Sequence, residues 1–306
     1  MNWKDVEWDR LRALRERFLQ PRAGDYWASR PDLEHYDLAF APRIACKWRA
    51  VWEALHLASR EPWTVVDWAC GTGIASRTLV EIFPAAVGPV QVWDRSRPAM
   101  DFAVAKLKQA GVEARSSEDV PEGRFLLLVS HVANELDDRG RAALEKFLGR
   151  ATAVVWVEPG TPAAFRALAQ VREQHRARLD WVLPCPHGGR CGLLDRADDW
   201  CHQFAPPLPE FFTQSEWVRF GREMQIDLRS LPVTFLAGAC PGEWTRTADS
   251  VVLGRPEVSK SHARALVCRA ESVGWESTRV HSKKDGDRFR APEFLRAWGA
   301  RETSQN

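Results

Sequence analysis

A short apolar strand, a glycine turn and a helix, between residues 63 and 83, constrain the fold of this chain most. The strand runs from Trp63 to Asp67, the turn contains Gly71 and Gly73, and a helix follows from about residue 75. Glycine lets the backbone approach a ligand closely, and the helix offers free amides at its first turn. The unit predicts an α/β fold with a ligand-binding loop after its first strand.

A second acidic residue follows this loop at a spacing that is typical of Rossmann folds. Residues 90–94 predict a strand that ends at Asp94, about twenty residues further on, where an acid binds ribose hydroxyls in Rossmann folds. The order Asp67, Gly71, Gly73 and then Asp94 resembles that of Rossmann-like, class I S-adenosylmethionine-dependent methyltransferases. Ser76 replaces the third glycine of a dinucleotide fingerprint. The alternative interpretation is a tight turn in an α/β domain that binds no nucleotide.

Strands and helices continue to alternate up to residue 180. We expect strands at 112–115, 125–130 and 153–158, and helices at 98–110, 138–148 and 162–179. The resemblance implies that Asp119, after the third strand, contacts the adenine ring of the donor. His131, Asn134 and Glu135 follow the buried strand 125–130, at the edge where ligands bind in open α/β folds. They are candidates to face the donor, and no residue is assigned as catalytic.

Three cysteines and two histidines stand within residues 184–202. Cys185, Cys191 and Cys201 lie among prolines and glycines with no helical or strand period, so a buried face of a regular element does not explain them. Thiolates on such a loop suit zinc or an iron–sulfur cluster. The gaps of five and nine residues exceed those of structural zinc knuckles, which weakens zinc without excluding it.

The fourth ligand of such a site stays open at this point. Cys240 or Cys268 would complete a cluster, whereas His187 or His202 would complete a zinc site. Free cysteines also occur as small buried hydrophobes, which is the simplest alternative for each of them.

Composition narrows the class of protein. The chain has 306 residues, 45% of them hydrophobic, so it can bury a large core in about two domains. Its 43 basic and 41 acidic residues nearly cancel, and no whole-molecule field indicates a nucleic acid or membrane partner. No apolar run approaches the ~18 residues that cross a bilayer. With an odd number of cysteines, seven, and no apolar signal near Met1, we expect a cytoplasmic protein. We also expect a monomer without a membrane partner.

The two ends of the chain add further regions. Strands at 228–237 and 250–253 are expected to close the core sheet as an antiparallel hairpin, and 263–269 with 275–281 to form a ribbon. Residues 255–301 hold eleven Lys or Arg against six Asp or Glu, so this part could contact phosphates or be ordinary charged surface. We expect N-terminal helices (1–60), a methyltransferase core (61–180), a Cys-rich insertion (181–224), the last core strands (225–254) and a basic β-rich extension (255–306).

Several motifs in this order resemble one family, the methyltransferase-like assembly factors of the small ribosomal subunit found in bacteria and mitochondria. The resemblance covers about residues 36 to 300. It is carried by Val157–Arg166 (VEPGTPAAFR), Pro184–His187 (PCPH), Cys191, Asp199–His202 (DWCH), Gly254–Pro256 (GRP), Cys268 and Trp298. The sequence departs from the family's pattern at Gly192 and at Gln203, and neither departure removes a cysteine.

The resemblance implies a four-iron four-sulfur cluster held by Cys185, Cys191, Cys201 and Cys268, with zinc as the alternative. It also implies binding of S-adenosylmethionine, and of the small ribosomal subunit and its rRNA during assembly.

Whether the chain is an enzyme stays open. Residues 130–135 (SHVANE) replace the polar-Pro-Pro-aromatic element with which amino-directed methylases hold their target. Two hypotheses follow: a non-catalytic assembly factor that acts in small-subunit assembly and translation, or an active rRNA or ribosomal-protein methyltransferase with a structural zinc site.

Overall fold

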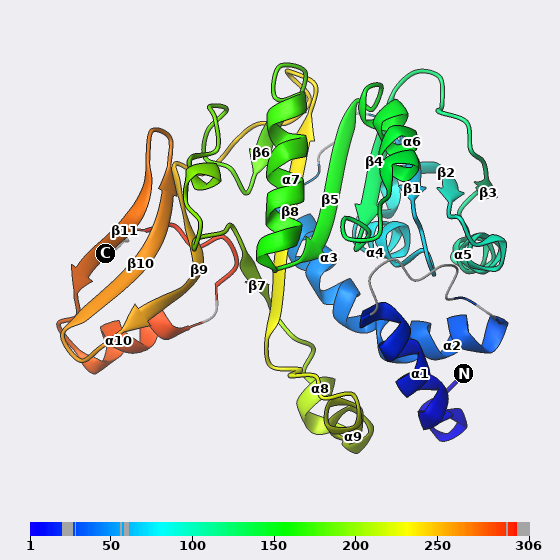
Figure 1. Cartoon of the computed structure of the whole chain (residues 1–306), viewed down its shortest axis with the longest axis horizontal. Coiled ribbons are helices and arrows are strands. Elements are labelled where there is room, and N and C mark those ends of the chain that lie inside the picture. The colour runs from blue at the N-terminus through cyan, green and yellow to red at the C-terminus, as the bar shows by residue number, and fades with distance from the viewer. Residues whose placement is uncertain (20–26, 28, 56, 58–60, 292, 299–306) are drawn as a thin grey trace.

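The computed structural model describes residues 1–19, 27, 29–55, 57, 61–291 and 293–298. Within these residues an eight-stranded sheet has the order β3-β2-β1-β4-β5-β8-β6, and β7 pairs with β8 (Figure 1). The bounds are β1 Trp63–Trp68, β2 Val87–Trp93, β3 Ala114–Ser116, β4 Phe125–Ser130, β5 Ala153–Pro159, β6 Asp180–Leu183, β7 Gln203–Ala205 and β8 Leu231–Ala239. The first five strands run parallel, and β8 runs antiparallel to β5, β6 and β7. The α/β class I methyltransferase fold expected from the sequence is confirmed.

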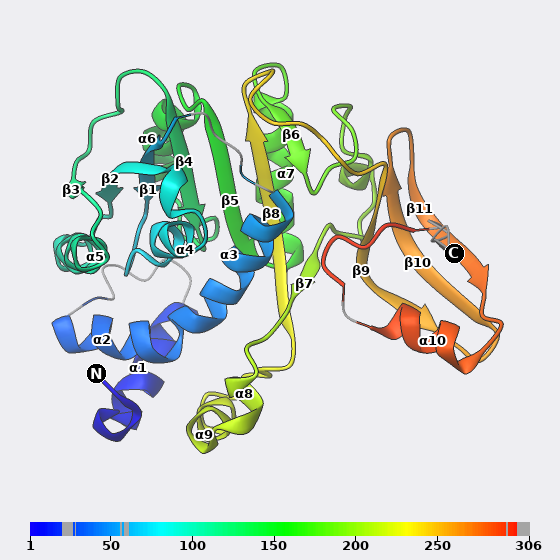
Figure 2. The same cartoon turned by 180° about the vertical axis from the view of Figure 1, so that it is seen from behind.

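Helices cover both faces of this sheet, as Figures 1 and 2 show from opposite sides. Leu126 and Leu128 of β4 belong to the core beneath α3 (Ala41–Leu55), α4 (Ile74–Ile82) and α5 (Arg97–Gln109). Leu127 belongs to the opposite core, beneath α6 (Asp138–Leu148) and α7 (Pro162–His175). A strand buried on both faces must be apolar throughout, which is why residues 125–130 are recognisable from sequence.

Side-chain caps fix where several of these helices begin. The Thr161 hydroxyl accepts a hydrogen bond from the Ala164 amide at 3.3 Å, as expected for a helix that starts at Pro162. Asp137 caps α6 in the same way. Helix α7 ends at His175 rather than near residue 179, because the chain turns there into the short strand β6, which the sequence analysis missed.

A second sheet of three strands, in the order β11-β10-β9, lies beside the first and carries helix α10 (Lys283–Arg290) (Figure 1). Its strands are β9 Ser250–Val258, β10 His262–Arg269 and β11 Val273–Arg279. The ribbon expected near 263–281 is therefore present. The expectation that residues 250–253 close the core sheet is wrong, because β9 pairs with β10 and β6 occupies the edge beside β8.

Two further groups of helices lie at one edge of the first sheet (Figure 1). Helices α1 (Trp8–Leu19) and α2 (Arg30–Ala39) precede α3, and α8 (Glu210–Thr213) and α9 (Ser215–Glu223) connect β7 to β8. Aromatic contacts join the two groups, for instance Trp3 with Trp217 at 4.8 Å between ring centroids. Among the described residues, no helix has the length and apolar character to cross a membrane.

Candidate functional site

The loop after β1 carries the first expected donor-binding acid. Asp67 is fully buried, and its Oδ2 accepts hydrogen bonds from the Ser76 amide at 3.2 Å and the Ser76 hydroxyl at 2.6 Å. Burial raises the pKa of Asp67 to about 7, although the bonds from Ser76 act in the opposite direction. Asp67 therefore ties the strand to the first turn of α4, and Ser76 takes the place of a third glycine.

The two glycines adopt backbone conformations that favour glycine. Gly71 has φ +50° and Gly73, which precedes α4, has φ +74°. A Cβ on Gly73 would lie 3.0 Å from the Cβ of Ala103. The Gly71 amide donates to Asp94 Oδ2 at 2.9 Å, so the structure brings Asp67, the two glycines and Asp94 together at one edge of the sheet.

Buried polar atoms without partners surround this loop. Among the described residues, Asp67 Oδ1, Thr72 Oγ1 and Ser96 Oγ are buried and make no hydrogen bond. Such atoms are costly unless a ligand or water pairs with them. Asp119 is exposed in the loop after β3, and its backbone carbonyl accepts a hydrogen bond from Gln91 Nε2 of β2 at 2.5 Å.

The carboxyl end of β4 lies beside this loop and presents His131. Its φ of +54° is unusual for a residue with a side chain. Lys47 Nζ of α3 lies 3.2 Å from His131 Nε2, and Ser130 Oγ lies 3.1 Å from His131 Nδ1. The Trp48 indole donates to the same hydroxyl at 3.0 Å. Four side chains thus form one hydrogen-bonded chain at this edge.

Burial shifts the pKa values of the ionisable side chains at this edge. Burial, the larger cause, and the charge of Arg43, one turn away on α3, together lower the pKa of Lys47 to about 7. Burial also lowers the pKa of His131 well below its ordinary value, with Lys47 as the second cause. Glu158, buried at the end of β5, accepts from the Val132 and Ala133 amides, and burial raises its pKa to about 7. Groups with such pKa values are able to exchange protons near neutral pH.

Of the other two candidates, Glu135 forms an ion pair with Arg95 at 3.5 Å, which links the ends of β4 and β2. Asn134 is exposed. The sequence analysis did not connect Lys47 with His131. The only available signal was a lysine among the buried positions of an amphipathic helix.

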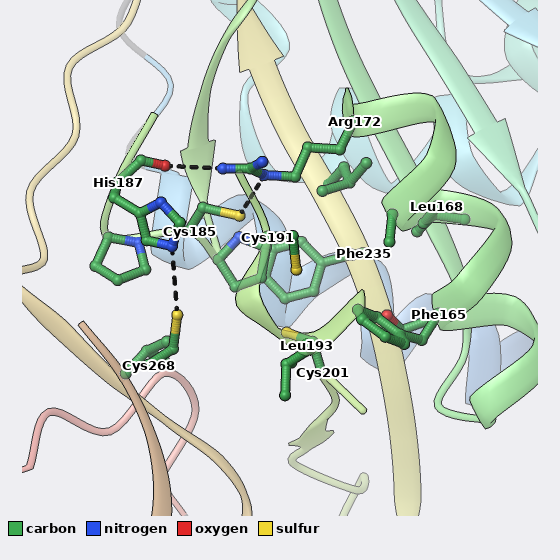
Figure 3. A pocket seen from close by; sticks show the side chains of 16 residues that line it. Phe165, Leu168, Arg172, Cys185, His187, Cys191, Leu193, Cys201, Phe235 and Cys268 are labelled. Atoms are coloured by element: carbon green, nitrogen blue, oxygen red, sulfur yellow. Dashed lines mark hydrogen bonds between the residues drawn. The ribbon is translucent and has the colours of Figure 1, made fainter. Parts of the chain in front are cut away.

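Four cysteines converge on one cavity between the two sheets (Figure 3). Cys185 and Cys191 come from the loop after β6, Cys201 precedes β7, and Cys268 lies on β10 of the second sheet. The cavity is otherwise lined mainly by apolar side chains, including Phe165, Leu168, Leu193 and Phe235. Its volume is about 30 Å³. Cys240, the other cysteine considered as a fourth ligand, is not among the lining residues.

The surroundings of these thiols are unfavourable to charge in the absence of a metal. Burial raises the pKa of Cys191 and, to about 12, that of Cys268, and it raises the pKa of Cys201 well above its ordinary value. His187 also lines the cavity, with Nε2 3.7 Å from Cys268 Sγ. His202 lies against Trp200 instead, with the rings stacked at 4.6 Å. In the described part of the chain, no three His, Cys, Asp or Glu side chains are grouped closely enough to bind one metal ion.

Arg172 is the cavity residue that the sequence analysis overlooked. It lies on α7, is 2% exposed and donates from Nε to Cys185 Sγ at 3.1 Å. Its position in the sequence did carry a signal, because it continues the buried stripe of Phe165, Leu168 and Ala169 at helical spacing. An arginine on an apolar stripe indicates a buried partner for its charge.

Comparison with known families gives a match over residues 38–301, to the family described as mitochondrial small ribosomal subunit Rsm22. The chain belongs to this family. The match includes β1 to β11 and all four cysteines of the cavity. A search of curated proteins found no matching sequence.

Several solved structures have a distant similarity to this chain. A candidate RNA methyltransferase, PH1948 from Pyrococcus horikoshii, is 13% identical, with a TM-score of 0.40 over 64% of this chain and 83% of that one. The plantazolicin methyltransferase BpumL in complex with SAH is 11% identical, with a TM-score of 0.40 over 78% and 97%. The methyltransferase domain of bacterial CtHen1 is 15% identical, with a TM-score of 0.39 over 64% and 99%. Similarity at this level assigns no function to the chain.

Proposed function

We propose that this Rsm22-family chain is an assembly factor that binds the small ribosomal subunit and its rRNA. In this proposal Cys185, Cys191, Cys201 and Cys268 hold a four-iron four-sulfur cluster, and the loop after β1 holds S-adenosylmethionine. The observation that carries the proposal is the convergence of four cysteines on one cavity, three from the segment between β6 and β7 and one from β10 of the second sheet. Membership of a small-ribosomal-subunit family supports the partner.

Four thiols suit a four-iron four-sulfur cluster, and zinc is the alternative for the same ligands. A single zinc ion needs its ligands about 2.0–2.3 Å from one point. In a four-iron cluster each thiolate binds a different iron, so the sulfur atoms stand further apart.

The loop after β1 supports donor binding. We propose that Asp67, Gly71, Gly73 and Asp94 contact the donor directly, and that Asp119 reaches its adenine ring. The buried Asp67 Oδ1 and Thr72 Oγ1 atoms have no partner among the described residues, and a polar ligand in the loop would pair with them. S-adenosylmethionine supplies an activated methyl group when bound.

The outer end of the second sheet suits RNA. Trp275 on β11 is 41% exposed, and the Arg264 guanidinium lies 4.2 Å from its ring centroid. His262 pairs in register with Arg279, and both are exposed. Bases stack on aromatic and guanidinium planes, and basic side chains bind phosphates. We therefore propose this surface, Arg264, Trp275 and Arg279, as the rRNA contact.

The regions expected from the sequence with boundaries near 60, 180 and 224 stay proposals, as do the monomeric state and the cytoplasmic location. Each is independent of the cluster and donor assignments. The expected boundary near 254 falls within β9 of the second sheet.

Anaerobic analysis of iron, sulfide and zinc in the purified chain tests the cluster. The proposal expects about four irons and four sulfides per chain. Stoichiometric zinc in a colourless protein would contradict it.

Binding to immature small subunits tests the partner: Trp275→Ala with Arg264→Ala should weaken binding. Arg229→Ala, whose exposed side chain pairs only with Asp227 in the described structure, is the control.

An active methyltransferase is the second candidate. The hydrogen-bonded side chains of Lys47, His131 and Ser130 favour it. A base with a pKa near 7 is suited to removing a proton from a methyl acceptor. Incubation of the chain and labelled S-adenosylmethionine with immature small subunits would detect methyl transfer. Label on rRNA or protein that disappears in His131→Ala supports catalysis, whereas donor binding without label supports the assembly factor.

A further inference from the structure

Arg172 carries a buried charge at the edge of the cysteine cavity. Its Nη2 donates to the His187 carbonyl at 3.0 Å, in addition to the bond from Nε to Cys185 Sγ (Figure 3). The same Nη2 donates to the Gly189 carbonyl at 2.8 Å. These contacts span the loop that carries two of the cysteines. One side chain therefore fixes both the sulfur of Cys185 and the backbone that follows it.

The neighbouring Glu173 holds the next cysteine. Its Oε1 accepts from Arg172 Nη1 at 2.5 Å and from the Cys191 amide at 3.0 Å. Arg176 also pairs with Glu173, at 3.3 Å, so one carboxylate serves two guanidinium groups. A buried cation is costly unless negative charge compensates it, and one shared carboxylate does so only in part.

We propose that Arg172 and Glu173 are the positioning pair of the cluster site: they preorganise Cys185 and Cys191, and Arg172 offsets the negative charge of the thiolate-bound cluster. The inference rests on the proposed function, because it requires the cluster. It adds an electrostatic role that the ligands alone do not supply. Hydrogen bonds to ligand sulfurs and nearby charge set the affinity and reduction potential of metal centres.

The sign of the effect follows from charge. Reduction adds one electron to the cluster, so a fixed positive charge and an N–H···S bond stabilise the reduced form more than the oxidised form. Replacement of Arg172 by a neutral residue should therefore lower the reduction potential. A tenfold loss of preference for the reduced form corresponds to a shift of about 59 mV for one electron. Loss of the loop contacts should also weaken cluster binding by about tenfold or more.

Anaerobic reconstitution with ferrous iron and sulfide tests this role in the full chain. The variants are Arg172→Gln, which removes the charge, and Arg172→Lys, which keeps the charge but loses the planar fork of donors. Arg178→Gln is a matched control, because Arg178 also donates to a backbone carbonyl (Ala151, 2.7 Å) and approaches a cysteine sulfur, that of Cys240 at 3.7 Å. Iron content, sulfide content and potentiometric titration are the readouts, with circular dichroism to monitor folding.

Arg172→Gln should bind less iron and have a lower potential than the wild type, and Arg178→Gln should match the wild type. Arg172→Lys should keep most of the potential but lose iron more readily to a chelator. If Arg172→Gln does not fold, the lysine variant decides by its rate of iron loss alone. Wild-type loading and potential in a folded Arg172 variant would overturn the inference. A wild type that binds no iron would refute the proposed function instead.

Discussion

Replacement of Cys268 by alanine should abolish the stabilisation that cluster binding gives to the second sheet. Cys201 and Cys268 lie roughly 70 residues apart in sequence, and β10 carries Cys268 on the far side of the cavity. A cross-link that closes a loop of this length lowers the entropy of the unfolded chain, which corresponds to about 4 kcal/mol at 25 °C. The loaded wild type should therefore gain up to about 4 kcal/mol of unfolding free energy over the metal-free protein, and Cys268→Ala should gain little.

Urea unfolding with and without reconstitution measures this gain, and hydrogen exchange locates it. Slower exchange on loading should appear at β9 to β11 in the wild type and be absent in Cys268→Ala. Cys240→Ala is the control, since Cys240 is also partly buried but lies outside the cavity. If Cys268→Ala binds as much iron as the wild type and its second sheet gains the same protection, the reasoning is refuted.

Three further predictions follow from single positions. Asp67→Asn should raise the free energy of unfolding above pH 7 but not below about pH 4. The pKa of the carboxyl is about 7 in the folded protein against an ordinary 3.8, so its ionisation destabilises the native state as pH rises. Unfolding measured between pH 4 and 8 tests this. Lys47→Met should raise the pKa of the nearby His131, which NMR titration measures, because the lysine charge lowers it; an unchanged value would argue against their contact. Gly254→Ala should cost about 1–3 kcal/mol in thermal unfolding, since φ is +75° and the new Cβ would lie 2.9 Å from the His202 ring; Gly274→Ala, with no atom within 4 Å, should change stability little.

The core could be predicted from the sequence because its signals are local. The strand at 125–130 and the helix at 138–148 match their expected bounds, since an apolar run and a capping Asp137 define them without reference to distant residues. The strand, turn and helix after residue 63 could be predicted for the same reason, because the acid and glycine positions lie close together in sequence. Their role in donor binding stays a prediction, as does that of Asp119.

The errors concern partners that are distant in sequence. Strand β9 pairs with β10 and not with β8, and strand propensity does not reveal that choice. Arg172 continues the buried stripe of α7, which marks it as buried, but its partners lie in the loop after β6 and are not visible from that stripe. The convergence of Cys268 with the other three cysteines was expected only through the family resemblance. The fold confirms the proximity of the four, while their role as ligands stays a prediction.

Gln203, one of the two residues that depart from the family's pattern, lies where the two sheets are joined. Its amide donates to the Val252 carbonyl at 2.7 Å and accepts from the Leu295 amide at 3.3 Å, while its backbone pairs with β8. It stands two positions after Cys201 in the chain. Mechanical force that pulls the two sheets apart would therefore load this joint and a cysteine of the cavity at the same moment, and release of one would loosen the other.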